Sequence, residues 1–502
     1  MLAVFWVFGA SIIIELLAQF IPLLWRFRKL MASFALLLVT FSAGAIVIFR
    51  PSLFSAIIAV ICLYRAFNDI RVVEGRMHEG YLHQATRRTT IILIFLQILT
   101  ALAWWAWHTW HQDGHLVWSV VAGLQLLAAI VLLISTIRSL KHTAWPARAR
   151  THYKDGELPT LTVAIPARNE TDDLQFCLES LVASDYPKME IIVLDDRSQT
   201  RRTPDIIRSF AHDGVRFVLG EEPKETWLPK NQAYDRLLGE ASGEMIIFCG
   251  VDIRFAPGTL RKIVSEMLVK NKTVMSILPE RAPMARSRFA LAQAMRYFWE
   301  LAPPRRQLQR PPVLSSCWAA KSEMLRKAGG FAAVARSIVP EAHFARMAAK
   351  TDSYSFMRAG KTLQLTSVKE ARDQRDTAIR TRYPQLHRRP ENVFVVSCLE
   401  VVFWIMPFAL AIAGYWLGIG LLAVLLAAIT SLLLIVGYEM ITSATYISSR
   451  SFGIIALPIV VLFDLGMLHY SMWQYELSVV EWKGRNVTLP AMHVIPHLPE
   501  IK

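Results

Sequence analysis

The chain has 502 residues, of which 54% are hydrophobic, and it has a mean hydropathy of +0.34 and a formal net charge of +15. This composition is too apolar for an ordinary soluble enzyme and excludes that class. The five cysteines are widely spaced and contain no CxxC pair, which argues against a disulfide scaffold and against a zinc site.

Apolar residues are concentrated in blocks at the two ends of the chain. A bilayer core of about 30 Å requires about 20 apolar residues per helix. The blocks that meet or approach this length are residues 2–25, 31–49, 90–107, 116–137, 393–413, 420–437 and 452–468, and a shorter block is 52–64. One such block could be a buried core helix, but blocks at both ends predict a membrane protein. We expect about five transmembrane helices before the middle of the chain and two or three after it.

Basic residues flank these blocks unevenly. Lys and Arg are frequent in residues 26–29, 65–88 and 138–150, whereas the expected loop 108–115 contains neither. Short loops rich in Lys and Arg stay in the cytoplasm, so the pattern predicts an external N-terminus and a cytoplasmic middle domain at the plasma (inner) membrane. A pI near 9.7 is also typical of nucleic-acid-binding proteins. Because the charges follow the membrane flanks, we expect no nucleic-acid partner.

The middle of the chain alternates short strands with helices. Expected strands are residues 160–165, 190–196, 215–219, 244–249 and 273–278, and expected helices are 171–184, 204–212, 230–241 and 257–270. This alternation predicts βαβ units and a parallel sheet, with a ligand site at the carboxyl ends of the strands. The expected division is a transmembrane region 1–150, an α/β domain 151–392, and a transmembrane region with a tail, 393–502.

Polar motifs follow the expected strands in a definite order. They read IPARNE (165–170), DDRS (195–198), FCGVDIRFAPG (248–258), SSCWAAKSEMLRKAGGF (315–331), PEAHFARMA (340–348) and QLHRR (385–389), with EWKGR (481–485) after the last apolar block. This series resembles family 2 glycosyltransferases, in particular membrane-embedded, lipid-directed members similar to ceramide glucosyltransferase and hopanoid-associated proteins. The resemblance implies a Rossmann-like α/β domain of the GT-A type, cytoplasmic and inserted between N-terminal and C-terminal transmembrane α-helical clusters.

The resemblance also assigns nine residues to binding the nucleotide-sugar: Pro166, Arg168, Asn169, Glu170, Asp195, Asp196, Lys230, Gln385 and Arg388. The two adjacent acids match a pair that holds uracil and ribose, since carboxylates accept hydrogen bonds from base N–H groups and sugar hydroxyls. An arginine in the QLHRR motif can form a fork of hydrogen bonds to a diphosphate. The structural alternatives are turn chemistry for the first loop, a helix cap for the acids, and a basic cluster on lipid headgroups for QLHRR.

Three positions depart from the pattern of these relatives. Gly250 stands at the first acid of an Asp-x-Asp motif, so Asp252 is left as the single protein carboxylate for a weakly held Mg²⁺ or Mn²⁺. Glu341 matches the catalytic base, which must remove the proton of the acceptor hydroxyl, with Pro340 as its neighbour. A first-turn helix acid is the alternative for this glutamate. Arg389 replaces a tryptophan that stacks on the acceptor sugar in polymer-extending relatives, which favours a single transfer.

The resemblance therefore implies an inverting, non-processive glycosyltransferase that uses a nucleotide-sugar, expected to be a UDP-sugar, a divalent cation and a membrane lipid acceptor. A processive polysaccharide synthase and a degenerate nucleotide- or lipid-binding scaffold are the alternatives. Glu15, Glu400 and Asp464 lie inside apolar blocks, where ionisable groups are costly and mark functional sites. Three full spans after the domain would place EWKGR outside, whereas a role near a cytoplasmic site requires it inside.

Overall fold

The computed structural model describes residues 7, 9–14, 28–49, 57, 59–62, 81–146, 153–224, 226–281, 289–303, 311–369, 371–446 and 453–488. The chain divides into two compact units, residues 1–121 with 418–420, and residues 122–417 with 421–502. Helix α2 (Arg28–Phe49) belongs to the first unit, and helix α4 (Tyr81–Thr143) begins there and ends in the second. All of the residues that concern the site lie in the second unit.

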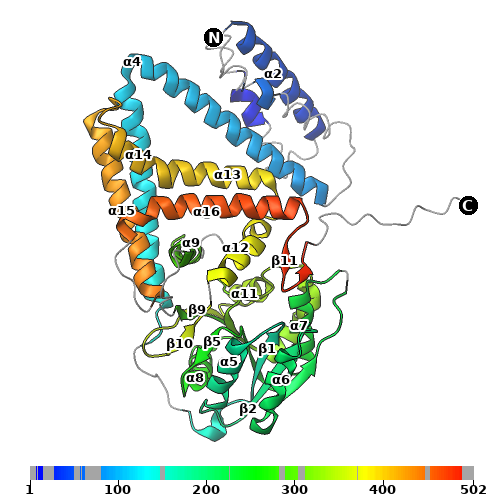
Figure 1. Cartoon of the computed structure of the whole chain (residues 1–502). Coiled ribbons are helices and arrows are strands. Elements are labelled where there is room, and N and C mark those ends of the chain that lie inside the picture. Colours follow the sequence, from blue (N-terminus) through cyan, green and yellow to red (C-terminus); the bar gives the residue numbers. More distant parts are fainter. Residues whose placement is uncertain are drawn as a thin grey trace, which may run out of the picture. The chain divides into compact units, whose positions relative to one another are not determined.

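A seven-stranded sheet in the order β3-β2-β1-β4-β8-β6-β9 is the centre of the α/β domain (Figure 1). Its strands are β1 (Leu161–Ala167), β2 (Met189–Asp195), β3 (Val215–Leu219), β4 (Met245–Cys249), β6 (Val274–Leu278), β8 (Cys317–Lys321) and β9 (Tyr354–Arg358). A small second sheet pairs β5 (Ile253–Phe255), β10 (Leu365–Ser367) and β7 (Glu280–Arg281). All strand pairs of the large sheet are parallel except those of β8, which runs antiparallel to β4 and β6. The prediction of a parallel sheet is therefore wrong at β8, because a strand buried on both faces carries no sign of its direction in its apolar sequence.

Helices cover both faces of this sheet. They are α5 (Asp172–Val182), α6 (Arg202–Ser209), α7 (Pro229–Glu240), α8 (Thr259–Val269), α10 (Ser322–Lys327) and α11 (Glu341–Lys350). Successive side chains of a strand point to opposite faces. In β1, Val163 therefore packs in one core cluster with Leu178 of α5, and Ala164 packs in another with Leu237 of α7. Each strand and helix expected between residues 160 and 278 is present, so these predictions are confirmed.

The remaining helices of the second unit are mostly apolar. They are α9 (Phe289–Leu301), α12 (Ala371–Gln385), α13 (Pro390–Glu400), a π-helical segment (Val401–Ile405), α14 (Met406–Ala413), α15 (Leu421–Thr445) and α16 (Gly453–Glu476). The polar helix α12 packs against the apolar helix α16. Among the described residues, three helices are long and apolar enough to cross a membrane: His115–Thr143, Pro390–Ala413 and Leu421–Thr445. On α15, Leu422 and Leu432 are each 59% exposed, which suits a lipid environment better than water.

The structure modifies two of the predicted membrane segments. Residues 108–115, which we expected as a loop, are helical within α4. This prediction was wrong because the segment has no proline, and its single glycine, Gly114, costs a helix only about 1 kcal/mol. The block 452–468 forms part of α16, which is not among the three helices above. Residues 2–25 and 52–64 fall mostly outside the described residues, as does Glu15.

Candidate active site

A polar cavity of about 250 Å³ lies at the carboxyl ends of β1 and β4. Its cationic lining residues are Lys230, Arg281, Arg296, Lys369, Arg380 and Lys483. Lys483 pairs with Glu170. The other five make no ion pair within 4 Å in the part of the chain that the structure describes. Six acids line the same cavity: Glu170, Asp173, Asp252, Asp373, Asp376 and Glu481. None of them pairs with these five cations in the described residues, so the cations at this edge of the sheet are available to a polyanion.

Burial affects the titration of these cations. It lowers the pKa of Lys230, an effect that the nearby Glu341 opposes. Burial also lowers the pKa of Lys369 to about 7, against the field of Asp252, and that of Arg380 to about 10. A bound diphosphate would stabilise the charged forms of these side chains and so raise their pKa values again.

Asp252 lies on the wall of this cavity, directly after β4. Its Oδ2 accepts a hydrogen bond from the Ser367 hydroxyl at 2.6 Å. A Cβ atom added to Gly250 would lie 2.6 Å from Asp252 Oδ1, so the absence of a side chain at Gly250 gives this carboxylate its room. Gly250 thus leaves room for the Asp252 carboxylate to lie over the backbone.

The donor atoms present fit a metal ion only in part. Within the described ranges, no group of three His, Cys, Asp or Glu side chains could hold a metal. Asp252 offers one carboxylate, which suits Mg²⁺ or Mn²⁺ when substrate phosphates and water supply the other ligands. The residues therefore fit a cation that arrives with its diphosphate, and not a resident metal.

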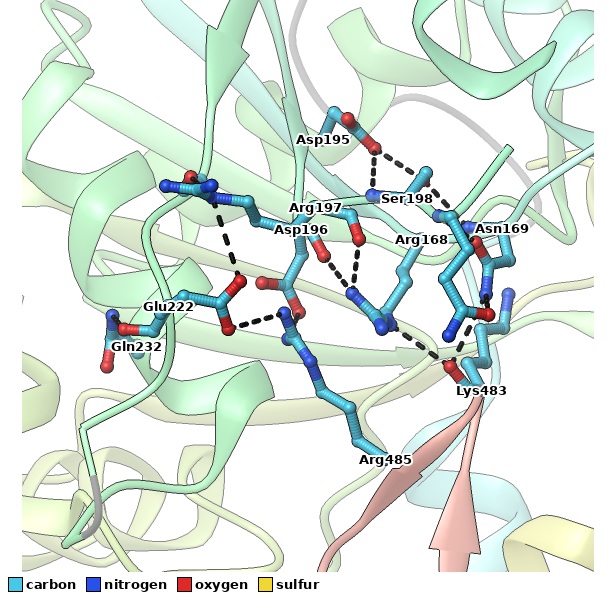
Figure 2. A network of polar contacts seen from close by, with 12 residues as sticks. Arg168, Asn169, Asp195, Asp196, Arg197, Ser198, Glu222, Gln232, Lys483 and Arg485 are labelled. Atoms are coloured by element: carbon cyan, nitrogen blue, oxygen red, sulfur yellow. Dashed lines mark hydrogen bonds and ion pairs between the residues drawn. The ribbon is translucent and has the colours of Figure 1, made fainter. Parts of the chain in front are cut away.

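The loops that follow β1 and β2 are bound to each other (Figure 2). Arg168 is only 4% exposed, and its Nη1 donates to the carbonyl oxygens of Asp196 and Arg197, each at 2.5 Å. Asn169 adopts a left-handed conformation with φ +48°, and its backbone N–H donates to Ser198 Oγ at 2.9 Å. Arg168 and Asn169 are therefore positioned to hold the two loops in register.

A hairpin of β11 (Glu481–Trp482) and β12 (Arg485–Asn486) packs on these loops. Arg485 Nη1 donates to Asp196 Oδ2 at 2.7 Å, and Lys483 Nζ pairs with the Glu170 carboxylate (Figure 2 shows the first pair). The carbonyl of Lys483 accepts from Arg168 Nε at 3.1 Å. The EWKGR segment thus lies on the α/β domain, which removes the conflict over the side on which the tail lies.

The two acids held by the hairpin are largely buried. Burial raises the pKa of Glu170, and the charge of Lys483 opposes this. Burial likewise raises the pKa of Asp196, and its hydrogen bond from Arg485 opposes this. Each acid depends on the hairpin cation to remain ionised, because a buried carboxylate without a partner is costly.

The structure brings together part of the predicted site. Pro166, Glu170, Lys230 and Asp252 line the polar cavity. Asp195 instead accepts hydrogen bonds from the backbone and hydroxyl of Ser198, as a local cap does. Asp196, besides its ion pair, borders a separate surface hollow of about 180 Å³.

Besides Arg168, Asn169, Asp195 and Asp196, three further predicted residues do not line the polar cavity. Glu341 is 1% exposed at the start of α11, and neither of its carboxylate oxygens has a hydrogen-bond partner within the described residues. It lies close enough to Lys230 and Tyr234 to influence the pKa of both. Gln385 borders a different, apolar cavity, and Arg388 stacks over Tyr475 with 5.1 Å between its Cζ and the ring centre.

The sequence analysis missed a stripe of α12 residues on the cavity wall. These are Asp373, Asp376, Thr377 and Arg380, which recur at helical spacing. Arg380 also lies over the Trp482 ring at 5.1 Å, and Lys369 donates to Thr377 Oγ1 at 2.7 Å. A polar stripe with period 3.6 in the segment DQRDTAIRTR was the available signal.

The fold and the cavity define an α/β domain of the nucleotide-binding kind. Residues 162–329 match the family model described as glycosyl transferase family 2. This segment therefore matches family 2 glycosyltransferases, as the motifs predicted, and its sheet with helices on both faces agrees with the predicted α/β domain.

Curated relatives agree over short segments. The glycosyltransferase AglE of Haloferax volcanii is 30% identical over 99 residues, which cover 19% of this chain and 31% of that protein. The probable glycosyltransferase YdaM of Bacillus subtilis is 34% identical over 100 residues, which cover 19% of this chain and 23% of that protein. The chain thus spans a third or less of the length of these relatives.

Solved structures are similar at a lower level. The mannosyltransferase PcManGT from Pyrobaculum calidifontis, solved in complex with GDP-Man and Mn²⁺, is 19% identical with a TM-score of 0.43, over 69% of this chain and 99% of that chain. Glucosyl-3-phosphoglycerate synthase from Mycobacterium tuberculosis is 18% identical with a TM-score of 0.32, over 47% of this chain and 84% of that chain.

Proposed function

We propose that this protein is an inverting, non-processive glycosyltransferase that moves a sugar from a UDP-sugar to a membrane lipid. The observation that carries the proposal is the set of five cationic side chains without ion-pair partners among the described residues, on one cavity of a family 2 domain. The negative charges of a nucleoside diphosphate would supply the ion-pair partners that these side chains do not have among the described residues. Arg389, which has no aromatic face for a growing sugar chain, favours a single transfer over polymer extension.

The transfer can be assigned to residues of this chain. The acceptor oxygen forms a bond to the anomeric carbon while the bond from that carbon to the diphosphate breaks, and the bonding electron pair leaves with the nucleotide. Lys230, Lys369 and Arg380 would stabilise the charge that develops on the leaving diphosphate. A divalent cation held by Asp252 would neutralise part of the same charge.

Glu341 would accept the proton of the acceptor hydroxyl. A carboxylate that is 1% exposed and has no hydrogen-bond partner within the described residues calls for a functional explanation. Since Glu341 is near Lys230 and Tyr234 and does not line the cavity, base catalysis requires a local rearrangement that brings its carboxylate to the acceptor. Arg168, Asn169 and the hairpin would shape the nucleotide end of the site.

The membrane setting of this proposal rests on the apolar helices. The three helices that could cross a bilayer come directly before and after the α/β domain in sequence. Lys and Arg in the flanking short segments favour a cytoplasmic domain at the plasma membrane, where nucleotide-sugars are available. A lipid acceptor would then reach the site from the bilayer.

The proposal is tested by measuring donor binding and transfer on the full chain in lipid nanodiscs. A panel of UDP- and GDP-sugars is titrated with and without Mg²⁺ or Mn²⁺, and radiolabelled sugar is then followed into extracted lipid. We expect one UDP-sugar to bind and to label a lipid product of discrete size. Donor binding without transfer to any lipid of a total membrane extract would contradict the proposed enzyme and support the scaffold alternative.

A further inference from the structure

A second, apolar cavity of about 450 Å³ lies among α4, α9, α12, α13, α15 and α16. Most of its wall is apolar, with side chains such as Leu132, Leu399, Phe403, Leu434 and Leu468. It shares no lining residue with the polar cavity. Concave apolar sites of this size with a few polar groups are typical of small-ligand binding.

Two buried hydrogen-bond acceptors face this cavity without a partner among the described residues. Glu400, at the end of α13, is 3% exposed, and its Oε2 accepts no hydrogen bond. Gln125 of α4 is 2% exposed, and its Nε2 donates to the Val402 carbonyl at 2.7 Å while its Oε1 has no partner. Buried polar atoms are almost always satisfied, so these two oxygens indicate that a ligand supplies the missing donors.

The charges on the cavity wall restrict the chemistry of that ligand. Arg382 of α12 forms an ion pair with Asp464 of α16. Both residues and Glu400 line the cavity, and Glu400 forms no ion pair within 4 Å among the described residues. Arg382 already neutralises Asp464, so the unsatisfied group on this wall is the acceptor oxygen of Glu400, to which a hydroxyl or ammonium group can donate.

The backbone of the cavity wall is unusual at the same place. The π-helical segment Val401–Ile405 interrupts the apolar helix, and Phe403 and Trp404 from this segment line the cavity. Its Val402 carbonyl is the group that Gln125 holds. Single-turn π segments are rare in proteins, and those that exist are frequently found at functional sites. The π segment therefore supports a functional role for this cavity wall.

The apolar cavity lies across two helices from the polar one. On α9, Arg296 faces the polar cavity and Trp299 faces the apolar one. On α12, Arg380 and Arg382 divide in the same way. The two cavities therefore lie on opposite sides of α12, and a head group bound near Glu400 must move past α9 and α12 to reach the proposed donor.

We propose that this cavity is the site through which the acceptor enters before transfer, and that it holds an amphiphile whose neutral or cationic head donates hydrogen bonds to Glu400 and Gln125. The acceptor role rests on the proposed function, whereas the binding of the amphiphile does not. The ligand class is a long-chain lipid with a hydroxyl or amine at its head. A lipid whose head has no hydrogen-bond donor cannot satisfy these two oxygens.

The test uses three photoactivatable probes with the same diazirine-bearing chain: a long-chain alcohol, the matching amine and the matching fatty acid methyl ester. The full chain in nanodiscs is irradiated, and labelled peptides that contain residues 125–132 and 396–404 are quantified by mass spectrometry. We expect saturable labelling by the alcohol or the amine, at least ~10-fold stronger than by the ester, which has no hydrogen-bond donor. Glu400→Gln keeps a neutral acceptor, so it should preserve labelling by the alcohol and abolish labelling by the amine.

A matched pair of variants separates the cavity from the general lipid surface. Ala128→Trp fills the wall of the cavity and should reduce labelling by at least ~10-fold, as expected when the space for a buried chain is lost. Ala428→Trp makes the same change at an exposed position of α15 that does not line the cavity, and should have no effect. Equal labelling by alcohol, amine and ester, or equal labelling in both variants, would overturn the inference and indicate bulk lipid only.

Donor binding measured on the same preparations distinguishes this inference from the proposed function. If the probe labels the cavity and no nucleotide-sugar binds, the proposed function fails and the acceptor role fails with it, while a lipid site stands. If a nucleotide-sugar binds and is transferred while labelling shows no dependence on the head group, the acceptor site is placed wrongly and only this inference is overturned.

Discussion

Glu341 combines nearly complete burial with two carboxylate oxygens that have no hydrogen-bond partner within the described ranges. If it is the base, Glu341→Gln cannot accept the proton, and transfer should fall by at least ~10²-fold while donor affinity is unchanged. Because the wild-type charge is buried without a partner, the neutral amide should leave the melting temperature equal or higher. Glu341→Asp should retain part of the activity. A purely structural first-turn acid predicts the opposite pattern, with reduced stability and activity lost only in proportion to folded protein.

Gly250 offers a second test at the scale of one residue. An added Cβ would meet Asp252 Oδ1 at 2.6 Å, so Gly250→Ala should displace this carboxylate and cost about 1 kcal/mol from its Ser367 hydrogen bond. Gly250→Asp carries the same Cβ and also supplies a second carboxylate for a cation. Donor titrations at several Mn²⁺ concentrations should show weakened cation dependence in the alanine variant and a lower cation requirement in the aspartate variant. Identical behaviour of the two variants would show that the added acid takes no part in metal binding.

Lys369 predicts the pH dependence of donor binding. Burial lowers its pKa to about 7 in the folded protein, so it loses its charge as the pH rises through this value. The unfolded chain keeps its proton up to a pKa of about 10.4, so between these two values the contribution of Lys369 to stability increases with pH. Donor affinity should change in the opposite direction and fall above about pH 7, because a diphosphate favours the charged lysine. Lys369→Arg, charged throughout, should remove this fall in a calorimetric titration from pH 6 to 9.

At the scale of elements, the hairpin β11–β12 connects the end of the described chain to the nucleotide loops. Lys483→Met leaves Glu170 buried without its cation and should destabilise the protein by about 1–3 kcal/mol. The double variant with Glu170→Gln should recover most of this loss, since no charge then lies unpaired. Melting temperatures of the four proteins form a double-mutant cycle. A double variant as unstable as the sum of its singles would show that the pair is an exposed contact of little value.

The strands and helices between residues 160 and 278 could be predicted because their apolar periods and turn residues are local signals. The direction of β8 could not, since nothing local distinguishes a parallel from an antiparallel strand that is buried on both faces. In the site, motif order placed Lys230 and Asp252 on the cavity. The contribution of Arg380 depends on how α12 packs, a tertiary property that propensity and period do not contain.

The hairpin illustrates the same limit over a longer distance. The pairing of Arg485 with Asp196 joins residues 289 positions apart. Charge complementarity between a tail cation and a loop acid is visible only once the fold brings them together. Gln385 and Arg388 show the reverse case, since their motif was recognisable and the fold places them away from the polar cavity.

At the scale of the whole molecule, the contacts of the tail predict membrane topology. Two helices after the α/β domain are long and apolar enough to cross a membrane, and the hairpin that follows α16 contacts the domain itself. Two crossings return the chain to its starting side, so the tail and the domain should both face the cytoplasm. The scarcity of Lys and Arg in residues 108–115, which are helical within α4, predicts that this segment faces the outside.

Labelling of single introduced cysteines measures on which side of the membrane each segment lies. Gly114→Cys should react with an impermeant maleimide in intact cells, whereas Gly156→Cys and Asn486→Cys should react only after permeabilisation. Four native cysteines, Cys62, Cys177, Cys249 and Cys317, are buried, and the partly exposed Cys398 is replaced by serine in every variant. Labelling of Asn486→Cys from outside would mean that α16 crosses the membrane, which would separate the hairpin from Asp196. Labelling of Gly156→Cys from outside would invert the whole arrangement and remove the α/β domain from cytoplasmic nucleotide-sugars.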